Sequence, residues 1–204
     1  YYDHLELEGD HHGVVIADVS GKGVAAGLLM AMCRSLLRSR ASDSVDPAET
    51  LGKVNRLLFP DIREDMFVSL FYAVIVGETG VIRLARAGHD AALLFRESSR
   101  EVEMVKPQGL ALGVDEGDVF ERVTKTTEIC LQPGDCLMFY TDGIQEAVDE
   151  SGAEFGKERL LSKFREHAPS GAEAVVKGIH RAVVEFTGEG PQMDDITLLV
   201  IERR

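Results

Sequence analysis

Several features that mark particular classes of protein are scarce in this sequence of 204 residues. Basic residues are few, since 22 Lys and Arg stand against 35 Asp and Glu and give a formal net charge of −13. This acidic balance argues against binding to nucleic acid or to an anionic membrane surface. No apolar run approaches the roughly 20 residues that a membrane-spanning helix needs. We therefore expect no nucleic-acid partner and no membrane span in this segment.

Cysteine is also scarce. Cys33, Cys130 and Cys136 are an odd number of cysteines, and they form no CxxC pair. This usage is typical of a reducing compartment and not of a disulfide-bonded secreted scaffold. The sequence begins with Tyr1 in place of Met and shows no signal peptide. We therefore expect a cytoplasmic protein, and we interpret the chain as part of a longer one.

Repeats, low-complexity tracts and linkers are absent from the sequence, which favours one globular domain. Helical patterns near both ends enclose a middle with strand patterns and hairpin turns, which predicts an α+β fold with antiparallel strands. The strands are predicted at residues 13–18, 66–76, 81–86, 91–95, 101–105, 119–129, 136–141 and 196–201. The helices are predicted at residues 24–38, 46–60, 157–166 and 172–186.

Aspartates stand at the edges of three apolar strand patterns. Asp18 follows GVVIA, Asp142 follows CLMFYT, and the pair Asp194-Asp195 precedes ITLLVI. Each carboxylate alone has an ordinary interpretation as a helix cap or a turn residue. Three such places together favour a site for hard cations such as Mg²⁺ or Mn²⁺, which prefer oxygen ligands.

Other catalytic motifs fail on their spacing. A P-loop would need Gly in place of Ile16 and Ser or Thr in place of Gly23, and no GxSxG elbow is present. The residues Ser20, Gly21 and Lys22 nevertheless precede a predicted helix, whose backbone N–H groups favour anions. They are candidate phosphate or substrate contacts, with tight backbone packing as the alternative.

An ordered series of motifs resembles the metal-dependent Ser/Thr protein phosphatases (the PPM or type-2C family), and in particular their bacterial SpoIIE/RsbU-like branch. The series covers nearly the whole chain and reads DVSGKGV, MFVSLFYAVI, RAGHD, YTDGIQEA and DDITLLVI. The resemblance implies an antiparallel β-sandwich flanked by helices in α-β-β-α layers, as a single phosphatase domain over residues 1–204. It also implies the C-terminal output domain of a longer protein, clipped at its N-terminus.

The same resemblance implies two divalent cations, Mn²⁺ or Mg²⁺, and a set of ligands. Asp18 is the expected bridge between the two ions, and the backbone carbonyl of Val19 is expected to reach the second ion. Asp142 and Asp194 are the expected further ligands. Asp195 is expected to bind as well or to orient the loop.

Two further positions follow from the resemblance. His89 is expected to have a structural or positioning role and no catalytic one. Relatives carry another ligand Asp just before the aromatic pair that stands here as Tyr1-Tyr2. Because the chain starts after that place, we expect weakened occupancy of at least one metal site in this fragment.

The implied activity is hydrolysis of phosphoserine or phosphothreonine by a metal-activated water molecule. The implied partners are a phosphorylated STAS-domain anti-sigma-factor antagonist as substrate, an upstream regulatory domain in the same chain, and a second copy in a homodimer. Two alternatives stay open. One is a catalytically weak phosphatase-like module that binds or regulates a partner, and the other is a metal-dependent hydrolase of small phosphate esters.

Overall fold

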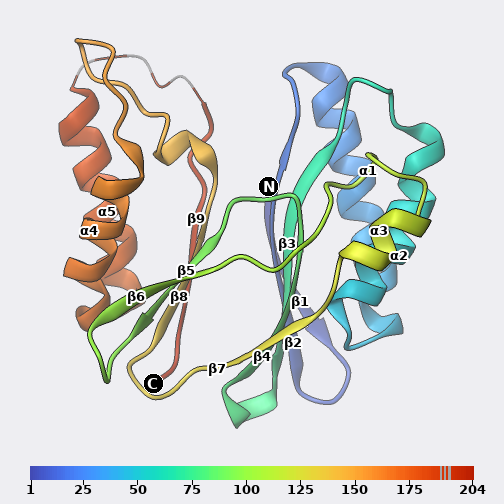
Figure 1. The fold of residues 1–204 in the computed structure, drawn as a ribbon, viewed down its shortest axis with the longest axis horizontal. Coiled ribbons are helices and arrows are strands. Elements are labelled where there is room, and N and C mark those ends of the chain that lie inside the picture. The colour runs from blue at the N-terminus through green and yellow to red at the C-terminus, as the bar shows by residue number, and fades with distance from the viewer. Residues whose placement is uncertain (189, 191, 193) are drawn as a thin grey trace. The chain divides into compact units, whose positions relative to one another are not determined.

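The computed structural model describes residues 1–188, 190, 192 and 194–204. The chain divides into two compact units (Figure 1). Unit 1 consists of Tyr1–His89 and Lys106–Cys130, and unit 2 consists of Asp90–Val105 and Leu131–Arg204. Each unit is one antiparallel sheet with helices packed on it, which confirms the predicted α+β class. None of the helices in the described part of the chain is long and apolar enough to cross a membrane.

Unit 1 contains a five-stranded antiparallel sheet in the order β1-β2-β3-β4-β7. Its strands are β1 (Tyr2–Leu7), β2 (His11–Val19), β3 (Val68–Val76), β4 (Val81–Ala87) and β7 (Thr127–Cys130). The central strand β3 is buried over most of its length and pairs with β2 and β4. The predicted hairpin of β3 and β4 is confirmed, whereas β1 has no counterpart among the predicted strands.

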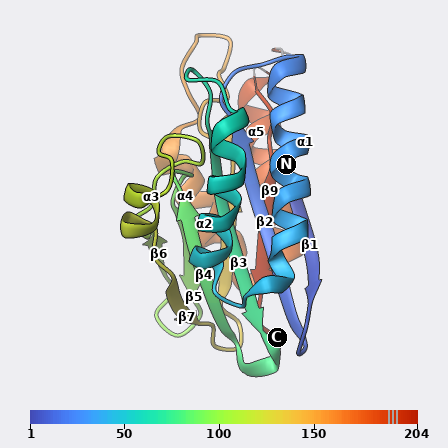
Figure 2. The ribbon, with the colours of Figure 1, turned by 90° about the vertical axis from the view of Figure 1, so that its right-hand side faces the viewer.

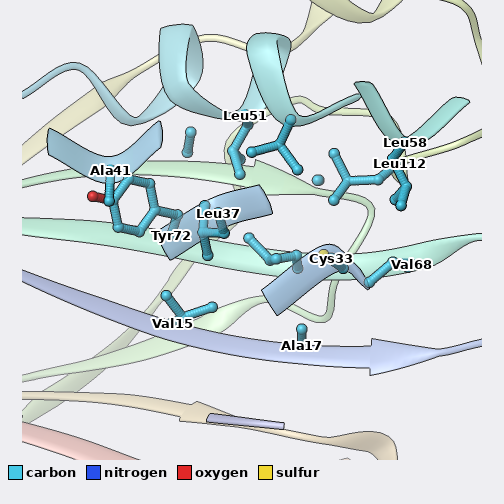
Figure 3. Close-up of a cluster of buried hydrophobic side chains, with 14 of the residues drawn as sticks. Val15, Ala17, Cys33, Leu37, Ala41, Leu51, Leu58, Val68, Tyr72 and Leu112 are labelled. Atoms are coloured by element: carbon cyan, nitrogen blue, oxygen red, sulfur yellow. The ribbon is translucent and has the colours of Figure 1, made fainter. Parts of the chain in front are cut away.

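Three helices belong to unit 1, namely α1 (Val24–Arg40), α2 (Pro47–Leu58) and α3 (Asp118–Val123). Helix α2 begins as predicted, because Asp46 accepts a hydrogen bond from the Ala48 amide at 2.9 Å and Pro47 takes the first helical position. Helices α1 and α2 lie side by side along the sheet (Figure 2). Their buried side chains meet those of the strands in one apolar core (Figure 3), which includes Val15, Cys33, Leu37, Leu51, Leu58, Val68 and Tyr72.

The structure corrects the prediction of a strand over residues 119–129. Only its last part forms β7, and its first part is helix α3. One carboxylate oxygen of Asp115 accepts hydrogen bonds from the amides of Gly117, Val119 and Phe120, at 3.0, 2.9 and 2.8 Å. These bonds cap the start of the helix, and the Phe120 ring is fully buried. Capping and burial together outweigh the strand propensity of the valines and the phenylalanine.

Unit 2 contains a four-stranded antiparallel sheet in the order β6-β5-β8-β9. Its strands are β5 (Ala92–Arg96), β6 (Glu101–Val105), β8 (Cys136–Tyr140) and β9 (Leu198–Glu202). Helices α4 (Gly156–His167) and α5 (Ala172–Thr187) pack on this sheet. The core side chains include Leu93, Phe95, Met138, Tyr140, Phe164 and Ile179. All these elements were predicted, with bounds that differ by no more than two residues.

A buried carboxylate fixes the turn that leads into β8. The Asp135 side chain is 1% exposed and accepts hydrogen bonds from the amides of Gln132 and Glu97, both at 2.9 Å. The Arg96 guanidinium donates a third bond at 2.8 Å. Burial alone raises the pKa of Asp135, but these donors stabilise its charged form and hold the pKa below its usual range. The entry into β8, at whose other end Asp142 follows, is therefore rigidly held.

Candidate metal centre

Asp18 lies near the end of β2 in unit 1. The residues before it, Val15 to Ala17, are almost fully buried, whereas Asp18 itself is partly exposed. In the ladder between β2 and β3, Asp18 stands directly opposite Ser69. Opposed residues of an antiparallel pair project from the same face of the sheet, with Cβ atoms about 4.5–5.5 Å apart. The structure thus places the predicted ligand Asp18 at a strand end, next to a hydroxyl that the sequence analysis did not single out.

Ser69 contacts a buried histidine. The Ser69 Oγ and the His89 Nδ1 atoms lie 2.9 Å apart, and His89 is only 4% exposed. The His89 and Phe71 rings are perpendicular to each other, with a centroid distance of 6.3 Å. The Arg86 guanidinium donates a hydrogen bond of 2.6 Å to the His89 carbonyl oxygen. Both the ring and the main chain of His89 are therefore held in place.

The loop between β2 and α1 carries the candidate phosphate contacts Ser20, Gly21 and Lys22. The Ser20 amide donates to the Phe67 carbonyl oxygen at 3.0 Å, and the Phe67 amide donates to the Ser20 hydroxyl oxygen at 2.8 Å. Gly21 and Gly23 have φ angles of +86° and +85°, which residues other than glycine rarely adopt. The loop is therefore tied to the start of β3, and its glycines are required by backbone conformation.

Asp142 follows β8 in unit 2, and the residue before it connects this position to the Asp194-Asp195 pair. The Thr141 hydroxyl donates to the Asp195 carbonyl oxygen at 3.0 Å and accepts from the Thr197 amide at 2.9 Å. The Thr141 amide donates to the Thr197 carbonyl oxygen at 3.1 Å. Three hydrogen bonds of one buried threonine thus hold the two predicted acidic segments together.

Gly143 completes this connection. A Cβ atom at Gly143 would lie 2.5 Å from the Asp195 carbonyl oxygen and 3.1 Å from its carbonyl carbon. Real Cβ contacts essentially never become so short, so only glycine lets the backbone of Asp195 pass this close. The glycine after Asp142 in the TDG motif therefore has a packing reason.

Carboxylates gather around these segments, and we call Asp90, Asp142, Glu146, Glu154 and Asp194 the acidic cluster. The pKa of Glu146 is raised, first by the charge of Asp142, then by burial and by the charges of the other three members. Gln145 also donates a hydrogen bond of 3.2 Å to Asp90. Sequence reasoning did not assign Asp90, Glu146 or Glu154 to the site, although Glu146 stands in the motif YTDGIQEA.

The predicted ligands divide between the two units, with Asp18 and Val19 in unit 1 and Asp142, Asp194 and Asp195 in unit 2. Within the described ranges, no group of three or more His, Cys, Asp or Glu side chains has the arrangement of a metal site. Unit 2 nevertheless concentrates carboxylate oxygens whose mutual repulsion a cation offsets. Oxygen donors of this kind suit Mn²⁺ and Mg²⁺, so the residues present fit these ions.

The family described as Stage II sporulation protein E (SpoIIE) matches residues 8–204 of this chain. A curated relative, the phosphoserine phosphatase RsbU of Bacillus subtilis (strain 168), is 26% identical over 203 residues. That alignment covers 100% of this chain and 59% of RsbU, so the chain spans about three fifths of its relative's length.

Two solved structures have similar folds. The SiaA-PP2C domain of Pseudomonas aeruginosa has a TM-score of 0.82 and 23% sequence identity, covering 99% of this chain and 79% of the SiaA chain. The structure of the RsbU and RsbW domains of Rv1364c from Mycobacterium tuberculosis has a TM-score of 0.80 and 26% identity. It covers 100% of this chain and 55% of the other. The fold of this chain is therefore that of PP2C phosphatase domains, as predicted.

Proposed function

The chain belongs to the SpoIIE family, and on this basis we propose that it is a protein serine/threonine phosphatase that uses divalent metal ions. One observation in the structure carries the proposal. The segments that bear Asp142 and Asp194 are locked together by Thr141 and Gly143, inside a cluster of acidic side chains. A module that only binds a partner has no need for such a concentration of negative charge, because the carboxylates repel one another.

The proposed ligands are those that the family resemblance implies. In unit 2, Asp142 and Asp194 would hold divalent ions, and Asp195 would bind as well or orient the loop. In unit 1, Asp18 and the Val19 carbonyl oxygen would hold divalent ions. Bound Mn²⁺ or Mg²⁺ would supply an acidified water molecule as nucleophile and positive charge for the phosphoryl oxygens.

The remaining roles fall to the chain itself. Thr141 and Gly143 hold the loops of Asp142 and Asp194 in register, so that little reorganisation is needed when ions bind. The loop of Ser20, Gly21 and Lys22 leads into α1, and the first backbone N–H groups of a helix suit the phosphate group of a substrate. The ties between Ser20 and Phe67 fix that loop in one conformation.

The proposed setting is a cytoplasmic partner-switching pathway. The similarity to RsbU and to a structure that holds RsbU and RsbW domains supports this setting. The substrate would be a phosphorylated STAS-domain anti-sigma-factor antagonist, and an upstream regulatory domain and a homodimer would control activity. Because the chain carries a net charge of −13, recognition of an acidic phosphoprotein must depend on local contacts more than on long-range attraction.

The alternative is a catalytically weak module that binds or regulates a partner. It is favoured by the finding that, as far as the structure describes the chain, no three ligand-type side chains are already arranged for a metal ion. The two functions differ in one measurable property, since only the phosphatase turns over a phosphoprotein.

The test is release of inorganic phosphate from a phosphoserine protein, with Mn²⁺ and with EDTA. We expect turnover that requires Mn²⁺ and is lost in Asp142→Asn. Glu185→Gln is the matched control, because it removes the charge of one exposed carboxylate on α5 outside the acidic cluster. Turnover that persists in EDTA or in Asp142→Asn would refute the proposal. A folded protein that binds Mn²⁺ without turnover would support the binding module.

A further inference from the structure

The partly buried Ser69 and the buried His89 form a polar pair beside the proposed metal ligand Asp18. Their side chains lie 2.9 Å apart, and Ser69 stands directly opposite Asp18 in the ladder of β2 and β3. All three residues belong to unit 1. We propose that Ser69 and His89 are positioning residues that orient the Asp18 carboxylate for metal binding. This inference rests on the proposed function, because it takes Asp18 as a ligand.

The register places Ser69 next to Asp18 on the sheet. Directly opposed residues share one face of the sheet, and the next opposed pair on that face is Ile16 with Phe71. The Phe71 ring in turn packs against the His89 ring. Asp18 and Ser69 therefore lie at one end of this strand pair, on the face opposite to the one that carries α1 and α2. His89, which follows β4, contacts Ser69 and Phe71 on that same face.

The direction of the hydrogen bonds gives each residue a role. A serine hydroxyl has a single hydrogen to donate. In the tautomer that carries a hydrogen on Nδ1, His89 donates a hydrogen bond to Ser69 Oγ. The Ser69 hydroxyl can then donate its own hydrogen to the Asp18 carboxylate. The chain of donors then runs from His89 to Ser69 to Asp18. A donor to one carboxylate oxygen restricts rotation of the carboxylate and leaves its other lone pairs for an ion.

His89 is well suited to this role because its surroundings leave it one orientation. The ring is 4% exposed, Phe71 packs against it, and Arg86 holds the carbonyl oxygen of the same residue. Gly88, just before it, has a φ of +70°, and a Cβ atom there would lie 2.8 Å from the Cβ of Ala111. The segment Gly88-His89 is thus confined on both sides.

The test measures Mn²⁺ binding by titration calorimetry, which needs no substrate. Loss of a hydrogen-bond donor to a metal ligand typically weakens affinity about 10- to 100-fold. We expect Ser69→Ala to raise the Mn²⁺ dissociation constant about tenfold. Ser69→Thr keeps the hydroxyl and should restore affinity. Thr50→Val is the matched control, because it removes a buried hydroxyl that donates within unit 1 to the carbonyl oxygen of Asp46, the N-cap residue of α2.

Two amide variants separate positioning from packing at His89. The side-chain amide of His89→Asn lies where Nδ1 was, so it can still donate to Ser69, whereas His89→Gln places its amide near the former Nε2. We expect His89→Asn to bind Mn²⁺ more tightly than His89→Gln. Equal affinities for the two variants, or wild-type affinity of Ser69→Ala, would overturn the inference.

Asp18→Asn distinguishes failure of this inference from failure of the proposed function. If Asp18→Asn abolishes binding and Ser69→Ala leaves it unchanged, only the positioning role is wrong. If Asp18→Asn itself leaves Mn²⁺ binding unchanged, the ligand assignment falls and the positioning role falls with it. In an Asp18→Asn background, Ser69→Ala should cause no further loss, because coupled residues are not additive.

Discussion

The carbonyl oxygen of Asp195 lies where a side chain at Gly143 would begin, only 2.5 Å from the position of its Cβ. The two residues are 52 positions apart in the sequence. Their contact brings the segment after β8 against the segment before β9, and the Thr141 hydroxyl bonds to the same carbonyl group. The arrangement of Asp142 and Asp194 therefore depends on a residue that has no functional group of its own.

Gly143→Ala should displace the Asp194-Asp195 segment. We expect a loss of about 1–3 kcal/mol in the free energy of unfolding, because the added methyl group overpacks a tight contact. Mn²⁺ affinity should fall about tenfold or more. Urea denaturation and Mn²⁺ titration measure the two effects. Gly27→Ala adds the same methyl group in helix α1 where nothing lies within 4 Å, and it should stabilise the protein by about 0.5–1 kcal/mol. Unchanged Mn²⁺ binding in Gly143→Ala would contradict the role of this contact.

Metal ions should stabilise the folded chain. An ion that binds only the native state at 100 times its dissociation constant adds about 2.7 kcal/mol, or about 5–10 °C in Tm for a chain of this size. Scanning calorimetry with and without Mn²⁺ measures the shift, and EDTA should reverse it. The shift should shrink in Asp194→Asn and persist in Glu185→Gln. A shift of equal size in both variants would exclude Asp194 as a ligand.

The buried Asp135 should make the free energy of unfolding fall at acidic pH. Its pKa is below the usual value in the folded state, so it contributes stability above the unfolded-state pKa of about 3.9. That contribution is lost as the pH falls through the lower pKa of the folded state. Asp135→Asn should cost about 3 kcal/mol at pH 7, because Arg96 loses its buried partner. Denaturation curves should show this difference narrowing below pH 4, and a difference independent of pH would count against the charged network.

Helix α3 should depend on a single aromatic side chain. Phe120 is fully buried against the core of unit 1, while the adjacent Val119 is 37% exposed. We expect Phe120→Ala to cost about 3–5 kcal/mol in the free energy of unfolding. Val119→Ala should change it by less than about 1 kcal/mol. Chemical denaturation of both variants measures the contrast, and similar losses would mean that α3 does not pack as described.

Most of the secondary structure was predictable because its signals are local. Asp46 and Pro47 indicate the start of α2. The alternation of apolar and basic residues after the Gly77–Thr79 turn indicates a hairpin. The error over residues 119–129 has a physical cause. The cap of α3 comes from Asp115, which lies outside the segment, and burial of Phe120 depends on α2 and the sheet. Neither influence is visible in strand propensity.

The candidate site was likewise predictable only where its signals are local in the sequence. The sequence alone determined the order of the motifs, the family resemblance and the three aspartate positions, because motifs consist of neighbouring residues. Tertiary structure alone decided which groups lie near those aspartates: Ser69 opposite Asp18, Gly143 against the Asp195 carbonyl group, and Glu146 near Asp142. Strand register and close backbone approach arise from packing between distant segments. They appear only once the chain has folded.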